Sequence, residues 1–232
     1  AADFDGDGKL DLAVSNALSR SLSFHRGKGD GTFLPAGRVA FGSPPHYLTA
    51  ADLNNDGLLD LIVPLVHENA VAILLGDGRG RFQPPRLAPV GAIPHMASPA
   101  DLNGDGRLDL VSTNAGAHTL TVLLGRGDGT FRRHADLEGG QLPHQVATGD
   151  LNRDGKADFA VVNSVSKNVS IFLGKGDGGF HPRRDILVGA DPSYMTAADL
   201  NGDGAVDLAL VRSGSNRVTV LLGDGDGRFG GR

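Results

Sequence analysis

DFDGDGKLD, residues 3–11, is the first of five copies of one loop, and the interval between the copies decides the fold. The others read DLNNDGLLD (52–60), DLNGDGRLD (101–109), DLNRDGKAD (150–158) and DLNGDGAVD (199–207), each starting 49 residues after the one before. A second motif keeps this interval: GKGDGTF (27–33), GDGRGRF (76–82), GRGDGTF (125–131), GKGDGGF (174–180) and GDGDGRF (223–229). Two motifs in one register indicate a repeat protein.

Short apolar segments of strand length separate these motifs and are bounded by Gly, Asn and Pro. In the second repeat they predict strands at 46–51, 59–63, 70–75 and 82–90. The third of these alternates bulky and small residues, as in Val71, Ala72 and Ile73, which is expected where sheets pack face to face. Four antiparallel strands cannot bury both faces of their sheet alone, so the repeats are expected to stack radially.

The sequence therefore predicts an all-β fold, a β-propeller of five 49-residue, four-stranded repeats that make one domain over residues 1–232. The first repeat is expected to lack its first strand and the last repeat its fourth, so both end blades would be incomplete. This pattern favours a piece of a six- or seven-bladed ring, and an incomplete five-bladed ring is the alternative.

Composition excludes several classes of protein. The 35 glycines and 12 prolines disfavour helix-rich architectures. No run of about 20 apolar residues is present, so no membrane span is expected. The chain has no cysteine for a disulfide framework, and with a net charge of -5 no nucleic-acid partner is expected.

Each acidic loop offers a set of oxygen ligands. In the pattern D-x-[DN]-x-D-G-x-x-D, positions 1, 3, 5 and 9 carry side-chain oxygens, and position 7 would contribute its carbonyl oxygen. Flexible, oxygen-rich coordination of this kind is typical of Ca²⁺. The five loops hold 16 of the 27 acidic residues. Carboxylates about 4 Å apart repel by roughly 4 kcal/mol per pair at an effective dielectric constant near 20, and a divalent cation reverses that sign.

The predicted calcium ligands are the same five positions of every loop. They are Asp3, Asp5, Asp7, Lys9 and Asp11; Asp52, Asn54, Asp56, Leu58 and Asp60; Asp101, Asn103, Asp105, Arg107 and Asp109; Asp150, Asn152, Asp154, Lys156 and Asp158; and Asp199, Asn201, Asp203, Ala205 and Asp207. An EF-hand does not fit, because its twelfth residue is a Glu between two helices, whereas here that position lies in a strand. The alternative is a metal-free hairpin rich in Asx turns, although such turns do not require an acid at position 9.

The loops are followed by DLAV, DLIV, DLVS, DFAV and DLAL, with LLG-x-G-x-G-x-F downstream. In these motifs, over essentially the whole chain, the sequence resembles FG-GAP/VCBS repeats, the blade unit of integrin α-subunit propellers and of many bacterial surface proteins. The resemblance implies that each acidic loop joins the first two strands of a blade on its lower face and holds Ca²⁺. The family divides between adhesion, carbohydrate binding and accessory domains of larger enzymes, so it implies the fold more sharply than the function.

The opposite, upper face is the predicted ligand-binding surface. It would carry the variable loops between second and third strands, at 15–21, 65–69, 114–118, 163–168 and 212–216. His46, His95 and His144 recur at one register as the chain enters the innermost strands, with Tyr47 and Tyr194 beside that register. Neutral imidazoles could bind a transition metal or a ligand there. The simpler interpretation is that each caps its strand, because adjacent blades should hold equivalent atoms too far apart for one ion.

The leading functional hypothesis is a non-catalytic, calcium-stabilised propeller that recognises a protein or cell-surface ligand through its upper-face loops. It would be extracellular, on the cell surface or periplasmic, because loops of this kind in extracellular modules bind Ca²⁺ with dissociation constants of about 10⁻⁴ to 10⁻³ M. The alternatives are a lectin-like module with a glycan ligand and an accessory domain of a larger secreted enzyme. No enzyme activity is expected of the chain itself, because it shows no nucleophile elbow, HExxH helix or phosphate loop.

Overall fold

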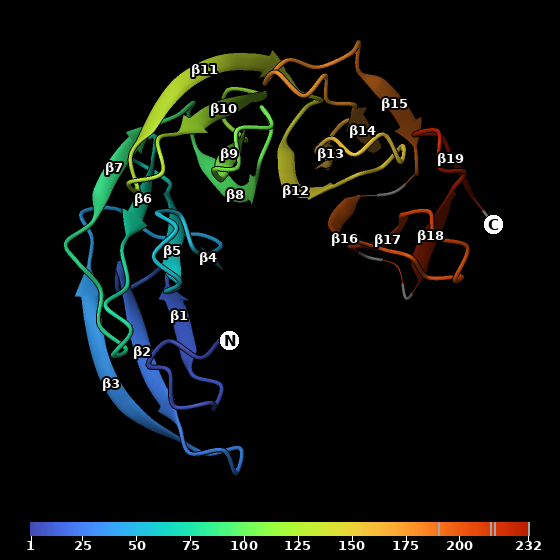
Figure 1. Cartoon of the computed structure of the whole chain (residues 1–232). Helices are drawn as coiled ribbons and strands as arrows, with labels where there is room; N and C mark the ends of the chain where they lie inside the picture. Colours follow the sequence, from blue (N-terminus) through green and yellow to red (C-terminus); the bar gives the residue numbers. More distant parts are fainter. Residues whose placement is uncertain (190, 214, 216, 232) are drawn as a thin grey trace.

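Antiparallel β-strands form five sheets that follow one another along an arc in the computed structural model, which describes residues 1–189, 191–213, 215 and 217–231 (Figure 1). In each sheet the strands lie in chain order, from the inner to the outer edge of the arc. This is the arrangement of propeller blades, so the predicted all-β propeller is confirmed. No helix that could cross a membrane is present in these residues.

The blades are numbered here along the chain. Blade 1 contains β1 (Leu12–Asn16), β2 (Ser21–Gly27) and β3 (Phe33–Ala40). Blade 2 contains β4 (Thr49–Ala51), β5 (Asp60–Leu65), β6 (Ala70–Leu74) and β7 (Arg86–Pro89), and blade 3 contains β8 (Pro94–Ala100), β9 (Asp109–Asn114), β10 (Thr119–Gly125) and β11 (Phe131–Glu138). Blade 4 contains β12 (Pro143–Gly149), β13 (Asp158–Asn163), β14 (Asn168–Phe172) and β15 (Arg184–Leu187). Blade 5 contains β16 (Pro192–Ala198), β17 (Asp207–Arg212), β18 (Val218–Gly223) and β19 (Phe229–Gly231).

The two end blades differ in how they match the sequence prediction. Blade 1 lacks an inner strand among the described residues, as expected, and keeps only an isolated bridge between Ala2 and Asp11. Blade 5 has all four strands, so the predicted absence of its fourth strand is wrong. The three residues of β19 continue the ladder, with Phe229 opposite Gly223. Such a short segment with two glycines carries no strand signal in sequence.

Apolar side chains fill the seams between successive blades. Each of the four core clusters combines residues from two neighbouring blades. Strand β6 shows how the sequence pattern produces this: Val71 and Ile73 pack toward blade 3, whereas Ala72 packs toward blade 1. The small residue allows the close approach of one sheet and the bulky residues fill the space before the next, which confirms the predicted face-to-face stacking.

Candidate functional site

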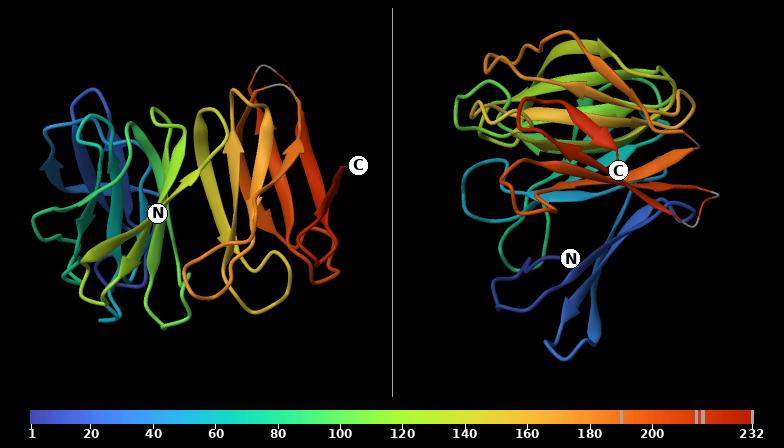
Figure 2. Two further views of the ribbon diagram at one scale, coloured as in Figure 1. Left: turned by 90° about the horizontal axis from the view of Figure 1, so that it is seen from above. Right: turned by 90° about the vertical axis from the view of Figure 1, so that its right-hand side faces the viewer.

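The predicted site residues lie at two opposite ends of the blades. In blade 4 the pairing of β12 with β13 begins at Pro143 and Asn163, beside His144, and ends at Gly149 and Asp158, beside the acidic loop. Five residues of strand, or about 17 Å, separate His144 from Gly149. Figure 2 shows the strands of neighbouring blades side by side between the two loop-bearing ends. We call the end with the acidic loops the lower face and the end with the histidines the upper face.

The acidic loops fold in one way around their own side-chain oxygens. The carboxylate at position 1 of every loop accepts a hydrogen bond from the backbone N–H of the glycine at position 6, at 2.8–2.9 Å. The oxygen at position 3 accepts from the N–H at position 5, and the oxygen at position 5 from the N–H at position 7, at 2.7–3.2 Å. In the fifth loop such bonds from Gly204 and Gly202 lower the pKa of Asp199. These are Asx turns, and the carboxylates keep further lone pairs for an ion.

The aspartate at position 9 has a role that the sequence did not reveal. In all five repeats (Asp11, Asp60, Asp109, Asp158 and Asp207) one oxygen accepts from the N–H at position 2 of its own loop, at 2.9–3.1 Å. The other oxygen accepts from the first glycine of the second motif, 16 residues further on, at 2.6–2.8 Å. This carboxylate therefore joins the two motifs, which explains why both keep one register.

The position-9 carboxylates, called the clamp carboxylates below because each joins the two motifs of its repeat, are buried. Asp60, Asp109, Asp158 and Asp207 are 0% exposed, and Asp11 is 4% exposed. Burial raises the pKa of Asp109, against the opposing effect of the N–H groups of Gly125 and Leu102. The glycine partner is required by close approach, because a Cβ on Gly125 would lie 2.1 Å from the carbonyl oxygen of Leu108. The acid at position 9 therefore has a structural role in the absence of an ion, which its prediction as a calcium ligand did not include.

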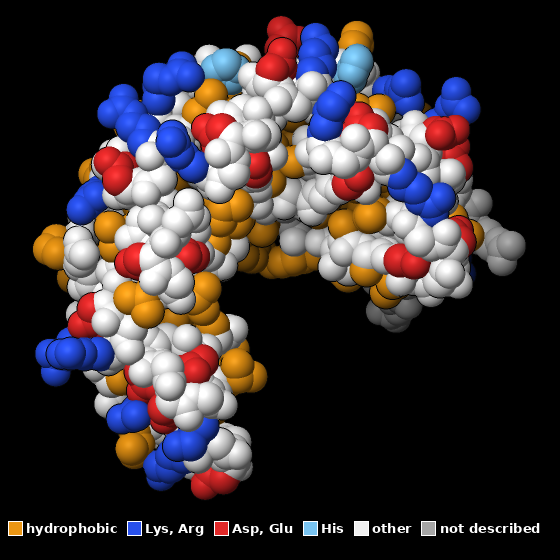
Figure 3. Space-filling view, in the orientation of Figure 1, with side chains coloured by type: hydrophobic (Ala, Val, Ile, Leu, Met, Phe, Trp, Pro, Cys, Tyr) orange, Lys and Arg blue, Asp and Glu red, His pale blue; other side chains and the backbone are white. Residues whose placement is uncertain are grey.

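The donor set of the loops fits a hard divalent cation. In the first loop one carboxylate oxygen from each of Asp3, Asp5 and Asp11 lies within 4.8 Å of the other two, the one such group of His, Cys, Asp and Glu in the described part of the chain. In the other four loops position 3 is Asn, whose amide oxygen also suits Ca²⁺. Figure 3 shows carboxylates in each blade on one face of the arc, with Lys and Arg gathered along its outer edge.

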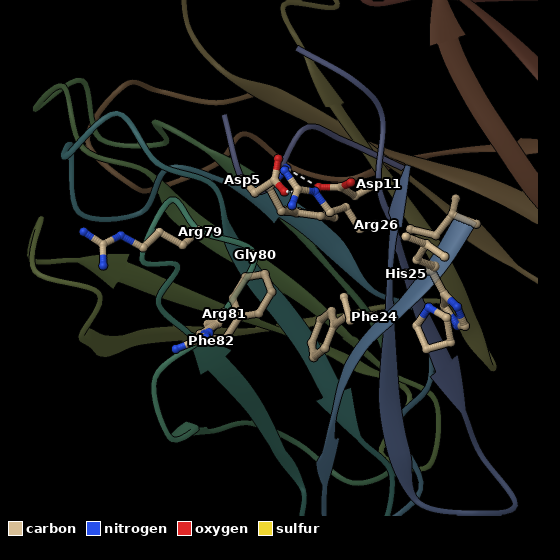
Figure 4. A pocket seen from close by; sticks show the side chains of 14 residues that line it. Asp5, Asp11, Phe24, His25, Arg26, Arg79, Gly80, Arg81 and Phe82 are labelled. Atoms are coloured by element: carbon tan, nitrogen blue, oxygen red, sulfur yellow. Dashed lines mark hydrogen bonds and ion pairs between the residues drawn. The ribbon is translucent and has the colours of Figure 1, made fainter. Parts of the chain in front are cut away.

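Arg26 distinguishes the first loop from the other four. Its Nε lies 2.7 Å from Asp5 Oδ2 and its Nη2 lies 3.2 Å from Asp7 Oδ2. The other four repeats have leucine at the equivalent position (Leu75, Leu124, Leu173 and Leu222) and Asn in place of Asp5. Figure 4 shows Arg26 reaching Asp5 at the edge of a pocket of 270 Å³ between blades 1 and 2, with Phe24 and Phe82 in its wall. The first loop thus has one more carboxylate than the others, that of Asp5, and Arg26 pairs with Asp5 and Asp7, two of the predicted calcium ligands.

The histidines and tyrosines of the upper face form one aromatic cluster. The ring centroids of His46 and His95 are 4.3 Å apart, those of His95 and His144 4.8 Å, and those of His46 and His144 6.2 Å. The rings of Tyr47 and Tyr194 lie 5.9 Å from that of His144, and the Tyr47 hydroxyl donates a hydrogen bond to the Tyr194 hydroxyl. The rings of adjacent blades therefore pack against one another, but their nitrogens do not all lie within 4.8 Å of one another, so the expectation that equivalent atoms are too far apart for one ion is not overturned.

Burial keeps the imidazoles neutral. It lowers the pKa of His46 and His144, and it lowers the pKa of His95 to about 4 with help from the neighbouring imidazoles. Burial, with the bond to Tyr194, raises the pKa of the Tyr47 hydroxyl, which therefore stays protonated. Neutral imidazoles keep a lone pair for a ligand. Of the predicted upper loops, that at 212–216 lies partly outside the described residues, at positions 214 and 216.

Comparison with protein-family models gives a match to the FG-GAP-like repeat over residues 3–63, 101–161 and 150–210. The chain belongs to the FG-GAP-like repeat family. No curated protein matches it in sequence.

Solved structures similar to this FG-GAP-like propeller include an Agrocybe aegerita lectin that recognises non-reducing terminal N-acetylglucosamine, with 23% identity and a TM-score of 0.68. They also include the Pseudomonas aeruginosa periplasmic gluconolactonase PpgL (18%, TM-score 0.72) and a Bacteroides fragilis protein named as a candidate 6-phosphogluconolactonase (17%, TM-score 0.74). The alignments cover 99%, 98% and 97% of this chain. The chain spans 63% of the lectin and 67% of the other two.

These neighbours contradict the prediction that the chain is not an enzyme. Two of them carry lactonase names on the same fold, at low identity. The lack of a familiar catalytic motif therefore does not separate binding propellers from enzymatic ones, because function depends on the site that a fold carries.

Proposed function

We propose that this FG-GAP-like propeller is a calcium-stabilised binding protein that works outside the cytosol and recognises a protein or cell-surface ligand with its upper face. The observation that carries the proposal is the fivefold recurrence of one loop, each copy folded around its first aspartate with further oxygens at positions 3 and 5. A turn alone does not need three or four carboxylates so close together, since they repel one another.

The residues that would hold the ion are those of positions 1, 3, 5, 7 and 9 in each loop. When bound, Ca²⁺ supplies positive charge that offsets the repulsion between the carboxylates. The loops also lie at the seams between blades: the N–H of Gly80 donates to the carbonyl of Phe4, and that of Gly178 to the carbonyl of Leu102. A loop fixed by an ion therefore also fixes the next blade.

The location outside the cytosol follows from affinity. Extracellular calcium modules have dissociation constants of about 10⁻⁴ to 10⁻³ M, so such sites fill outside the cell and stay empty in the cytosol. The periplasmic gluconolactonase among the structural neighbours is compatible with this location.

A calcium titration of chelated protein tests the proposal. We expect four sites of similar affinity, in blades 2 to 5, and a weaker first site, because Arg26 occupies its carboxylates. Isothermal titration calorimetry counts the sites. Arg26→Leu, which copies the other repeats, should strengthen the first site by roughly tenfold or more, since it removes a cation beside the ion. Absence of calcium binding contradicts the proposal, and five equal sites in the unmodified protein contradict the role of Arg26.

A carbohydrate ligand is the second candidate, favoured by the likeness to a lectin that recognises N-acetylglucosamine. Tyr194 is the exposed aromatic of the upper-face cluster, with 45% of its surface accessible, and aromatic faces are common platforms for sugars. We expect any signal on a glycan array to fall at least tenfold in Tyr194→Ala, because the platform is lost. His134→Ala, on the exposed outer strand β11, is the control. A signal that survives Tyr194→Ala rules out this face as the sugar site.

A further inference from the structure

The histidine cluster carries an inference that does not depend on the calcium proposal. We infer that His46, His95 and His144 form a site for a late first-row transition metal such as Zn²⁺, at the axis of the upper face. Each residue comes from the same register of a different blade, so the repeat itself brings three imidazoles together.

The first observation is a set of unpaired nitrogens. The Nδ1 atoms of His46, His95 and His144 are buried and have no hydrogen-bond partner, and one other side-chain atom of the described residues shares this state. A buried polar atom without a partner costs about 1–3 kcal/mol. Three such atoms in one cluster of neutral rings indicate a missing partner, and an ion that accepts imidazole lone pairs supplies one for all three.

The second observation is the spacing of the rings. Zinc–nitrogen bonds of about 2.0–2.1 Å place the centroids of imidazoles around a tetrahedral ion roughly 5 Å apart. The three observed separations of 4.3, 4.8 and 6.2 Å bracket that value. In the present rotamers, no choice of one nitrogen from each ring places all three nitrogens within 4.8 Å of one another. The rings of His46 and His95 are stacked at an interplanar angle of 13°, so at least one of them has to turn before both lone pairs can reach one ion. Rotation about the Cβ–Cγ bond, which has a broad energy well in histidine, provides that adjustment.

The third observation is that the backbone is distorted where these residues sit. The strand register shifts between Pro94 and Met96 in β8 and between Pro143 and Gln145 in β12, so that His95 and His144 are the extra residues of β-bulges. Bulges re-aim a side chain and occur beside functional sites. Two residues before each histidine, Ile93 (φ 53°) and Leu142 (φ 56°) have left-handed backbone, which is costly for such side chains.

Three imidazoles leave one tetrahedral position open. An open position is typical of an ion that binds a further ligand, whereas structural zinc sites use four protein ligands. The rings of Tyr47 and Tyr194 lie 5.9 Å from that of His144, so both tyrosines border the cluster. The site would therefore take a ligand with an oxygen or nitrogen donor, at the face that the variable loops surround.

Zinc titration of calcium-saturated protein tests the inference, because calcium blocks the acidic loops. The chain is first cleared of metals with a chelator and reloaded with Ca²⁺. We expect one Zn²⁺ per chain by calorimetry, and a Co²⁺-substituted sample should give the absorption spectrum of a tetrahedral nitrogen-ligated ion. His95→Ala should weaken zinc binding roughly 100-fold or more, since it removes one of three ligands.

His134→Ala, which removes an exposed histidine from the outer strand β11, is the matched control and should leave zinc binding unchanged. His144→Gln is the second variant in case His95→Ala does not fold, and the far-ultraviolet circular dichroism spectrum of each variant reports its folding. Failure of the unmodified protein to bind zinc overturns the inference, as does zinc binding that is the same in the His95 and His144 variants. Neither outcome affects the calcium proposal, whose sites lie on the opposite face.

Discussion

Asp109→Ala is expected to lower the free energy of unfolding by roughly 3–5 kcal/mol. The carboxylate is fully buried and accepts the N–H groups of Leu102 at 3.0 Å and Gly125 at 2.7 Å. Alanine leaves both donors buried without an acceptor, at about 1–3 kcal/mol each, and adds a small cavity. Denaturant unfolding in the presence of a chelator measures the loss without any contribution from calcium.

The control for this prediction is Asp128→Ala. Asp128 also accepts a backbone N–H, that of Thr130 at 2.8 Å, but on an exposed turn, so its loss is expected to cost under about 1 kcal/mol. If Asp109→Ala does not fold, Asp109→Asn, which keeps one acceptor, is expected to be intermediate. Equal stability of the Asp109 and Asp128 variants would contradict the stabilising role of the buried carboxylate.

The repeat was enough to predict the fold, and it was not enough to predict the site. Spacing gives the architecture because each 49-residue unit has to bury its sheet against the next. The clamp was missed because the partners of Asp109 are backbone N–H groups, which leave no mark in the sequence. The predicted calcium ion alone accounted for the carboxylate of Asp109 in the sequence interpretation. The constant distance of 16 residues between this aspartate and the first glycine of the second motif was, however, a usable signal.

The sequence placed the histidine cluster in the right register, but it did not predict that the rings pack against one another. The sequence shows that His46, His95 and His144 are equivalent, whereas the bulges that turn two of them toward the axis depend on the pairing of β8 and β12 with their neighbours. Arg26 is the opposite case. Alignment of the five repeats sets it against four leucines, so its difference was visible, and the ion pair with Asp5 supplies the reason.

Removal of calcium is expected to lower the free energy of unfolding by roughly 5–6 kcal/mol, because four sites at ten times their dissociation constant contribute about 1.4 kcal/mol each. For a chain of this length that is a fall in melting temperature of about 10–20 °C. Asp105→Asn tests the origin of the effect. It keeps an oxygen for the N–H of Arg107, so the calcium-free protein should melt as before, while the calcium-dependent shift falls by about a quarter. Scanning calorimetry with Ca²⁺, Mg²⁺ or chelator measures both quantities. An equal shift with Mg²⁺ would mean that the loops do not select Ca²⁺. No shift with Ca²⁺ would mean that the buried aspartates at position 9 and the apolar seams hold the blades together without an ion.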